Sequence, residues 1–241
     1  MTQTPKKPIP TYTGELRKHA LRVPSVIREC SGIVVFGRRI KSVVFTTDLC
    51  IVRNIDADAV LAVYPFTPQP IITQALLMAA DIPVFAGVGG GLTTGHRVTQ
   101  LAAFAEMQGA SGVVMNAPTS NEILREVSRV TEAPAIITVV NDQVDFISRV
   151  EAGAAIFNVA AGAETPALVR KIRAVLPEFP VIATGGPTED SIRETIQAGA
   201  NAISWTPPPT AALFKDSMEA YRENKPHPLG ALQKEAVLRN L

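Results

Sequence analysis

The sequence predicts a single-domain (β/α)8 TIM barrel, and three observations carry this prediction. Short apolar runs rich in β-branched residues alternate with amphipathic segments, as in parallel strands buried on both faces and their connecting helices. The second half of the chain repeats the order of features in the first, so that Gly185–Gly186 corresponds to Gly89–Gly90. The length of 241 residues is typical of one such barrel. An open doubly wound sheet is the alternative.

The expected strands follow in chain order. Residues 33–36 are expected to form a small extra strand covering the bottom of the barrel, followed by a basic turn at 37–39. The eight barrel strands are centred near Val44, Ala62, Phe85, Val114, Ile137, Phe157, Ile182 and Ser204. Gly109, Gly153 and Gly199 lie where helix C-caps are expected, just before three of these strands.

The chain ends fall outside this pattern. We expect residues 1–31 to form an N-terminal extension that is partly helical, 32–224 the barrel, and 225–241 a C-terminal tail with a short helix near 232–238. Pro24 makes an unbroken helix over 15–30 doubtful.

Composition narrows the class of protein. Hydrophobic residues make up 46% of the chain and the net charge is +1, which supports a large core and gives no reason to expect nucleic acid or an anionic membrane as partner. No apolar run has the length of a membrane span, and no apolar segment follows the first lysines. We expect a cytoplasmic protein that forms homo-oligomers.

Two glycine-rich strand exits are candidate phosphate sites. Thr184, Gly185 and Gly186 follow the seventh strand, and Gly89, Gly90 and Gly91 follow the third. Backbone amides at glycines can approach an anion closely. The alternative is that these glycines only permit tight turns. Thr206 is a further candidate after the eighth strand, although the three prolines that follow it remove amide donors.

Polar side chains at other strand exits are candidate catalytic groups. Asp48 follows the first strand and Asp142 the fifth, so the pair would suit a general acid and a general base on opposite sides of the mouth. The alternative is that each aspartate caps a helix. Asn116 and Asn158 could orient a substrate, or could be buried amides bonded to backbone.

Other chemistries find less support. The only lysine near a strand is Lys41, at the wrong end for a Schiff base, and the histidines lie in separate segments. We therefore expect no metal and no cofactor.

These motifs resemble the phosphate-binding barrels of the ribulose-phosphate-binding superfamily, over about residues 41–220. Residues 180–190 are similar to their strand-seven phosphate motif, and 83–91 to the glycine motif of the histidine-biosynthesis half-barrel duplications. The resemblance implies phosphate binding by the glycine pairs and acid–base roles for Asp48 and Asp142. The residues around these two aspartates depart from the catalytic motifs of those enzymes.

The sequence thus predicts an isomerase or lyase that acts on a phosphorylated sugar or sugar-derived metabolite by metal-free acid–base chemistry. A noncatalytic or regulatory barrel that binds a phosphorylated ligand is the alternative. A metal-dependent hydrolase is a weaker third hypothesis.

Overall fold

The structure is a computed structural model that describes residue 10 and residues 21–226. Most of the expected N-terminal extension, and the expected tail helix near 232–238, lie outside the described residues. Contacts divide the chain into two compact units, one formed by Arg22–Thr210 and the other by Met1–Leu21 with Ala211–Leu241. The first unit contains the barrel and both cavities described below.

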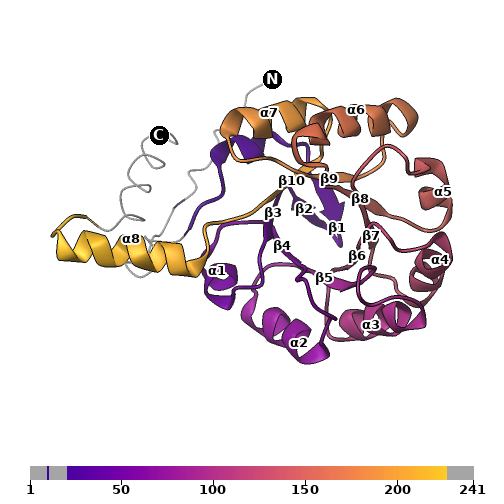
Figure 1. Ribbon diagram of the computed structural model, residues 1–241, viewed down its shortest axis with the longest axis horizontal. Helices are drawn as coiled ribbons and strands as arrows, with labels where there is room; N and C mark the ends of the chain where they lie inside the picture. The colour runs from indigo at the N-terminus through magenta and orange to yellow at the C-terminus, as the bar shows by residue number, and fades with distance from the viewer. Residues whose placement is uncertain (1–9, 11–20, 227–241) are drawn as a thin grey trace, which may run out of the picture. The chain divides into compact units, whose positions relative to one another are not determined.

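Eight parallel strands close into a barrel, as predicted (Figure 1). Their order around the barrel is β10-β3-β4-β5-β6-β7-β8-β9, so each strand pairs with its neighbours in the chain and the last pairs with the first. Every expected strand centre falls within one of them. The strands are β3 Ser42–Phe45, β4 Ala59–Ala62, β5 Val84–Gly89, β6 Gly112–Met115, β7 Ala135–Val139, β8 Ile156–Val159, β9 Val181–Thr184 and β10 Ala202–Trp205.

Helices follow the strands and surround the barrel in the first unit (Figure 1). They are α1 Leu49–Asn54, α2 Pro70–Ala79, α3 His96–Met107, α4 Asn121–Val130, α5 Phe146–Glu151, the 3-10 helix η3 Gly162–Glu164, α6 Thr165–Val175 and α7 Glu189–Gln197. The last described helix, α8 Thr210–Arg222, belongs to the second unit from Ala211 onward. No helix among the described residues is long and apolar enough to cross a bilayer.

The predicted glycine C-caps are confirmed. Gly109, Gly153 and Gly199 all have a positive φ, of 104°, 102° and 110°, the left-handed conformation that glycine adopts without a steric penalty. The Gly109 amide donates to the Glu106 carbonyl over 2.8 Å, which closes the last turn of α3. Each of these turns leads directly into the next strand, and so fixes where that strand enters the barrel.

A hairpin closes the bottom of the barrel. Strand β1, Ile33–Val35, confirms the predicted extra strand, and it pairs in antiparallel fashion with β2, Arg38–Ile40. The expectation of a turn at 37–39 was wrong, because the turn is made by Phe36 and Gly37, both with positive φ. The inward-facing side chains of the hairpin join the barrel core, in a cluster that contains Ile33, Val35, Ile40, Val43, Phe85, Val114, Ile136 and Ile182.

The chain reaches this hairpin through a 3-10 helix. Helix η2, Ser25–Glu29, directly follows Pro24, so within the described residues the region 15–30 is not an unbroken α-helix, in line with the doubt raised by Pro24. Proline lacks the amide that a continuous α-helix would need at that point. Val26 and Ile27 of η2 are buried.

A candidate ligand site at the mouth of the barrel

A cavity of about 510 Å³ opens at the C-terminal ends of the strands. The cavity has two walls of different chemistry, each formed by strands that are neighbours in the barrel. Strands β3 and β4 and the loops after β4 and β5 supply mainly apolar groups, whereas β6 to β10 supply most of the polar ones. The polar side chains that line it are Tyr64, Thr93, Asn116, Thr138, Asn158, Thr184, Ser204 and Thr206. The described lining residues include no acid, lysine, arginine or histidine.

Asn158 lies at the centre of the polar wall. Its side chain is buried, and its Nδ2 donates a hydrogen bond to Oγ1 of Thr138 over 3.2 Å. The two residues are partners in the register of β7 and β8. The Oδ1 atom of Asn158 is buried without a hydrogen-bond partner among the described residues. Such an acceptor costs free energy until a ligand or a water supplies a donor.

A second cross-strand pair continues this wall. Thr184 and Ser204 are partners in the register of β9 and β10, and both line the cavity. Ser204 is buried, with 6% of its surface exposed. Adjacent side chains on neighbouring parallel strands point to the same face, so the two hydroxyls extend the polar wall beyond Asn158.

The facing wall is apolar and carries one titratable group. Phe45, Leu61, Val63, Phe66 and Leu92 line it, and Phe66 and Leu92 are 69% and 83% exposed. Tyr64 also lines this wall, and its hydroxyl accepts a hydrogen bond from the amide of Gln69 over 2.8 Å. Because the oxygen is the acceptor in this bond, the phenolic O–H is still able to donate to another group.

The glycines after β5 divide into lining and packing positions. Gly89 and Gly91 line the cavity and Gly90 does not. The Gly90 amide donates to the Thr93 carbonyl over 2.8 Å, and an added Cβ at Gly90 would lie 2.1 Å from Oγ1 of Thr119. Gly90 is therefore needed for close packing against the loop after β6, and its amide is occupied. Thr93, in the loop after β5, lines the cavity, and its buried Oγ1 has no hydrogen-bond partner among the described residues.

After β9, Thr184 lines the cavity but Gly185 and Gly186 do not. The Gly185 amide donates to the Ser204 carbonyl over 3.3 Å, and an added Cβ there would lie 2.7 Å from Ile203. Helix α7 then begins with two acidic residues, which disfavour an anion at its N-terminus. This placement favours the tight-turn alternative for Gly185 and Gly186. Thr206 lines the cavity after β10.

Asp48 is the N-cap of α1 and does not line the cavity. Its Oδ1 accepts from the amides of Cys50 and Ile51 over 2.8 and 3.3 Å. A hydrogen bond from the Thr210 side chain, together with these amides, lowers the pKa of Asp48. A carboxyl held in its ionised form suits a helix cap and is unsuited to act as a general acid.

Asp142 also lies away from the cavity, so the two carboxylates do not face each other across it. The Asp142 side chain is 51% exposed and forms an ion pair with Lys171, whose hydrogen bond and charge lower the pKa of Asp142. It caps no helix either, because Asp145 is the N-cap of α5. A catalytic role for Asp48 or Asp142 stays a prediction that no contact with the cavity supports.

Asn116 lines the cavity from the loop after β6. Its Oδ1 accepts from the Ala117 amide over 2.9 Å. Arg149 of α5 holds this loop by donating to the Ala117 carbonyl over 3.1 Å and to Oδ1 of Asn121 over 2.9 Å. Burial lowers the pKa of Arg149. The guanidinium is a positioning group for Asn116.

Three residues of the site were missed by sequence reasoning, namely Tyr64, Thr138 and Ser204, whereas Thr93 was expected as a hydroxyl donor beside the glycines after the third barrel strand. A usable signal exists for two of them. Thr138 and Ser204 are hydroxyl residues near the ends of otherwise apolar strands, where an apolar side chain is the default. Tyr64 lies in the loop after β4, and nothing in a loop sequence tells which side chain turns inward.

Comparison with known proteins supports the fold. No protein-family model and no curated protein sequence matches the chain. Among solved structures, phosphoenolpyruvate phosphomutase from Streptomyces platensis subsp. rosaceus is similar, at 12% identity and a TM-score of 0.60, covering 76% of this chain and 83% of that one. Phosphonopyruvate hydrolase in complex with oxalate and Mg²⁺ has 11% identity and a TM-score of 0.59, covering 85% and 93%.

A third similar structure is 2,3-dimethylmalate lyase, described as a PEP mutase/isocitrate lyase superfamily member. It is 13% identical with a TM-score of 0.59, and the match covers 86% of each chain. At these identities the likeness shows the fold alone. The similar structures do not support the narrower resemblance to ribulose-phosphate-binding and histidine-biosynthesis barrels. The chain is a (β/α)8 TIM barrel.

Proposed function

We propose that this chain is an enzyme of the isomerase, mutase or lyase type that acts on a small metabolite carrying a phosphate or carboxylate group, bound in the mouth cavity. The position of the cavity supports this, because active sites of (β/α)8 barrels lie at the C-terminal ends of the strands. The mutase, hydrolase and lyase named above share the fold, which supports the class of reaction by analogy only.

One observation carries the proposal: Asn158 and Thr93 line the cavity, and each has a buried polar atom, Oδ1 and Oγ1, without a partner among the described residues. A buried polar atom is normally hydrogen-bonded. A bound metabolite that has a hydroxyl group as well as its anionic group would donate to Asn158. The hydroxyls of Thr184, Ser204 and Thr206 would donate to the anionic oxygens.

The two walls would contact different parts of the ligand. The apolar wall would cover the carbon skeleton and exclude water, which strengthens every hydrogen bond made by the opposite wall. Tyr64 would donate or accept a proton, because it is the one titratable side chain among the described lining residues. The bond from the Gln69 amide would hold the hydroxyl of Tyr64 in place.

The residues present do not fit a resident Mg²⁺ ion of the kind named for phosphonopyruvate hydrolase. Magnesium is held by carboxylates and water oxygens, and no carboxylate lines the cavity. Within residue 10 and residues 21–226, no group of three or more acidic, histidine or cysteine side chains could hold a metal ion. We therefore assign the proposed chemistry to the side chains of the cavity.

The second candidate function is a noncatalytic barrel that binds the same class of ligand. The observation that favours it is the neutral lining, which offers a single titratable group where acid–base enzymes commonly have two. Both candidates predict binding, and they differ in turnover.

The test combines binding and turnover. A panel of phosphorylated and carboxylated metabolites is incubated with the protein, with products followed by ¹H and ³¹P NMR, on wild type and Tyr64→Phe. An enzyme converts at least one compound, and Tyr64→Phe lowers the rate about 100-fold or more while still binding it. Binding without turnover in the wild type would favour the noncatalytic barrel. Turnover that survives in Tyr64→Phe would remove the role of the phenol.

A further inference from the structure

We infer that the opposite end of the barrel carries a separate oxyanion site, which takes inorganic phosphate or the phosphoryl group of a metabolite. A cavity of about 300 Å³ lies there, at the N-terminal ends of β3 and β4. It is lined by Val23, Ile27, Arg28, Arg39, Lys41, Ser42 and Asp58. None of these residues lines the mouth cavity, so this inference does not rest on the proposed function.

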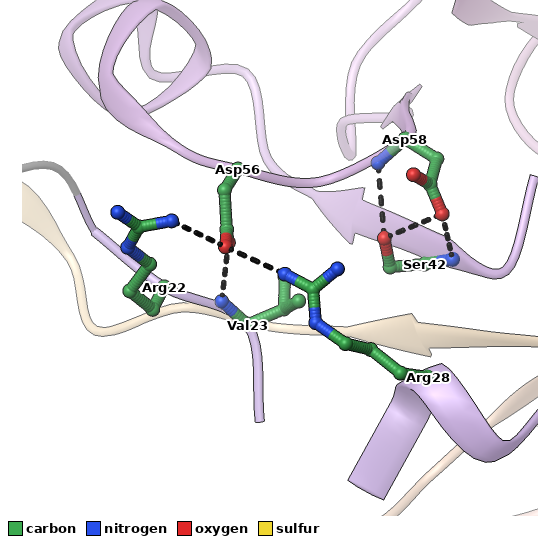
Figure 2. Close-up of polar contacts among 6 residues, drawn as sticks. All are labelled: Arg22, Val23, Arg28, Ser42, Asp56 and Asp58. Atoms are coloured by element: carbon green, nitrogen blue, oxygen red, sulfur yellow. Dashed lines mark hydrogen bonds and ion pairs between the residues drawn. The ribbon is translucent and has the colours of Figure 1, made fainter. Parts of the chain in front are cut away.

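Positive charge dominates the lining. Arg28, Arg39 and Lys41 are cations, and Asp58 is the one acid among the described lining residues. Asp58 is held by neutral donors. Its Oδ2 accepts from the hydroxyl and from the amide of Ser42, each over 2.9 Å (Figure 2). The amide of Lys41 donates to the same atom, also over 2.9 Å. In these bonds Asp58 pairs with no cationic side chain, so it forms no ion pair that would occupy Arg28, Arg39 or Lys41.

Arg28 is only partly neutralised by its neighbour. Asp56 accepts from Nη2 of Arg28 over 3.1 Å and from Nη1 of Arg22 over 3.2 Å (Figure 2). The amide of Val23 also donates to Asp56, over 2.8 Å. One carboxylate is thus shared by two guanidinium groups, which leaves a positive surplus beside the cavity.

Arg39 and Lys41 are anchored to backbone carbonyls, and neither forms an ion pair with an acid of the described part of the chain. Nε of Arg39 donates to the Ser31 carbonyl over 2.7 Å, and Nζ of Lys41 donates to the Arg28 carbonyl over 2.6 Å. These bonds order the two side chains and use one donor of each. A guanidinium has four further N–H groups and an ammonium two, which are the donors that phosphate oxygens require.

Gly32 provides the space in which these two side chains lie. Its φ is +87°, and an added Cβ would come within 2.8 Å of Cγ of Arg39 and 3.3 Å of Cγ of Lys41. A larger residue at this position would push both stems away. Gly32 thus leaves room for the two cations that line this cavity, a preorganised arrangement suited to a phosphoryl group.

The test is isothermal titration of the full chain with inorganic phosphate and with glycerol 3-phosphate, at constant ionic strength with chloride as the reference anion. The variants are Arg39→Gln and Lys41→Gln. Arg38→Gln is the matched control, because it removes the same charge from the same exposed strand at a residue that does not line the cavity. We expect Arg39→Gln and Lys41→Gln to weaken binding about tenfold each, the loss of one charge-assisted hydrogen bond.

Each outcome decides the inference. Tighter binding of the ester than of inorganic phosphate would identify a metabolite as the ligand, and equal binding would identify the free ion. No binding beyond that of chloride, or equal weakening by Arg38→Gln and Arg39→Gln, would overturn the inference. If Asn158→Leu loses phosphate binding and Arg39→Gln keeps it, phosphate binds in the mouth cavity instead. That result would overturn the present inference and leave the proposed function standing.

Discussion

Asn158 donates from Nδ2 to Oγ1 of Thr138 over 3.2 Å, across neighbouring strands at the mouth of the barrel. The bond satisfies one end of a buried amide and leaves its other end, Oδ1, without a partner among the described residues. The pair is more than a local packing detail, because it fixes the orientation in which the amide faces the cavity. The site is built around an ordered but incomplete set of hydrogen bonds.

A double-mutant cycle on this pair is the first prediction. Thr138→Val should destabilise the free protein by about 1–3 kcal/mol, because it leaves the Nδ2 group of Asn158 buried without an acceptor. The double variant with Asn158→Leu should recover most of that loss, since both polar groups are then gone. Urea unfolding measures each free energy. Additive losses in the double variant would show that the two side chains do not interact.

The second prediction separates two glycines that share a positive φ. Gly90→Ala should destabilise the fold by about 3 kcal/mol or more, because the added Cβ meets Oγ1 of Thr119 at 2.1 Å and the Asn116 amide nitrogen at 2.7 Å. Gly109→Ala is the matched control. At Gly109 no atom lies within 4 Å of the added Cβ, so only the backbone cost of about 1 kcal/mol is expected. Equal losses would refute the packing role of Gly90.

The barrel itself could be predicted because buried parallel strands leave a strong pattern of apolar runs, and glycine C-caps mark the points between helices and strands. Strand β2 was missed because Arg38 and Arg39 are exposed and Ile40 is the one buried residue of this three-residue strand. Exposed basic residues next to a glycine look the same in a turn and in a short edge strand.

The candidate site was predictable only in part. Asn116, Asn158, Gly89, Gly91, Thr184 and Thr206 line the cavity as the strand-exit rule indicated. Gly90, Gly185 and Gly186 do not line the cavity. The sequence could not reveal this, because close backbone packing and anion binding both require glycine. Asp48 and Asp142 were proposed as catalytic groups because carboxylates can transfer protons. An aspartate after a strand can, however, line the mouth, cap the next helix or form an ion pair at the surface. Which one prevails depends on neighbours distant in the chain, such as Lys171.

The third prediction concerns the pH dependence of stability. The pKa of Asp48 is lower in the folded protein than its ordinary value of 3.8. The ionised carboxylate of Asp48 therefore stabilises the fold fully at pH values above 3.8. The effect is lost as the pH falls through the lower, folded value. Asn caps helices as well as Asp does, so Asp48→Asn should match the wild type in acid and be less stable near pH 6. Thermal unfolding of both proteins from pH 6 to pH 2.5 tests this. A constant difference over the whole range would contradict the assignment.

The fourth prediction concerns the two free cysteines. Burial raises the pKa of the Cys30 thiol to about 12, whereas Cys50 is exposed. Because the thiolate is the reactive form, a thiol reagent at pH 8 should modify Cys50 at least about 100-fold faster than Cys30. Cys50→Ser should remove the fast phase, and guanidinium should make the remaining thiol react at once. A fast phase that persists in Cys50→Ser would show that Cys30 is accessible.

The central claim is that the cavity between the neutral polar wall and the apolar wall is the ligand site. It is tested most directly by the shift in melting temperature that a panel of phosphorylated and carboxylated metabolites causes in wild type, Asn158→Leu and Arg39→Gln. We predict at least one compound that stabilises wild type and Arg39→Gln equally, with that stabilisation abolished in folded Asn158→Leu. A panel that stabilises none of the proteins, or one whose effect is the same in wild type and Asn158→Leu, would contradict the claim.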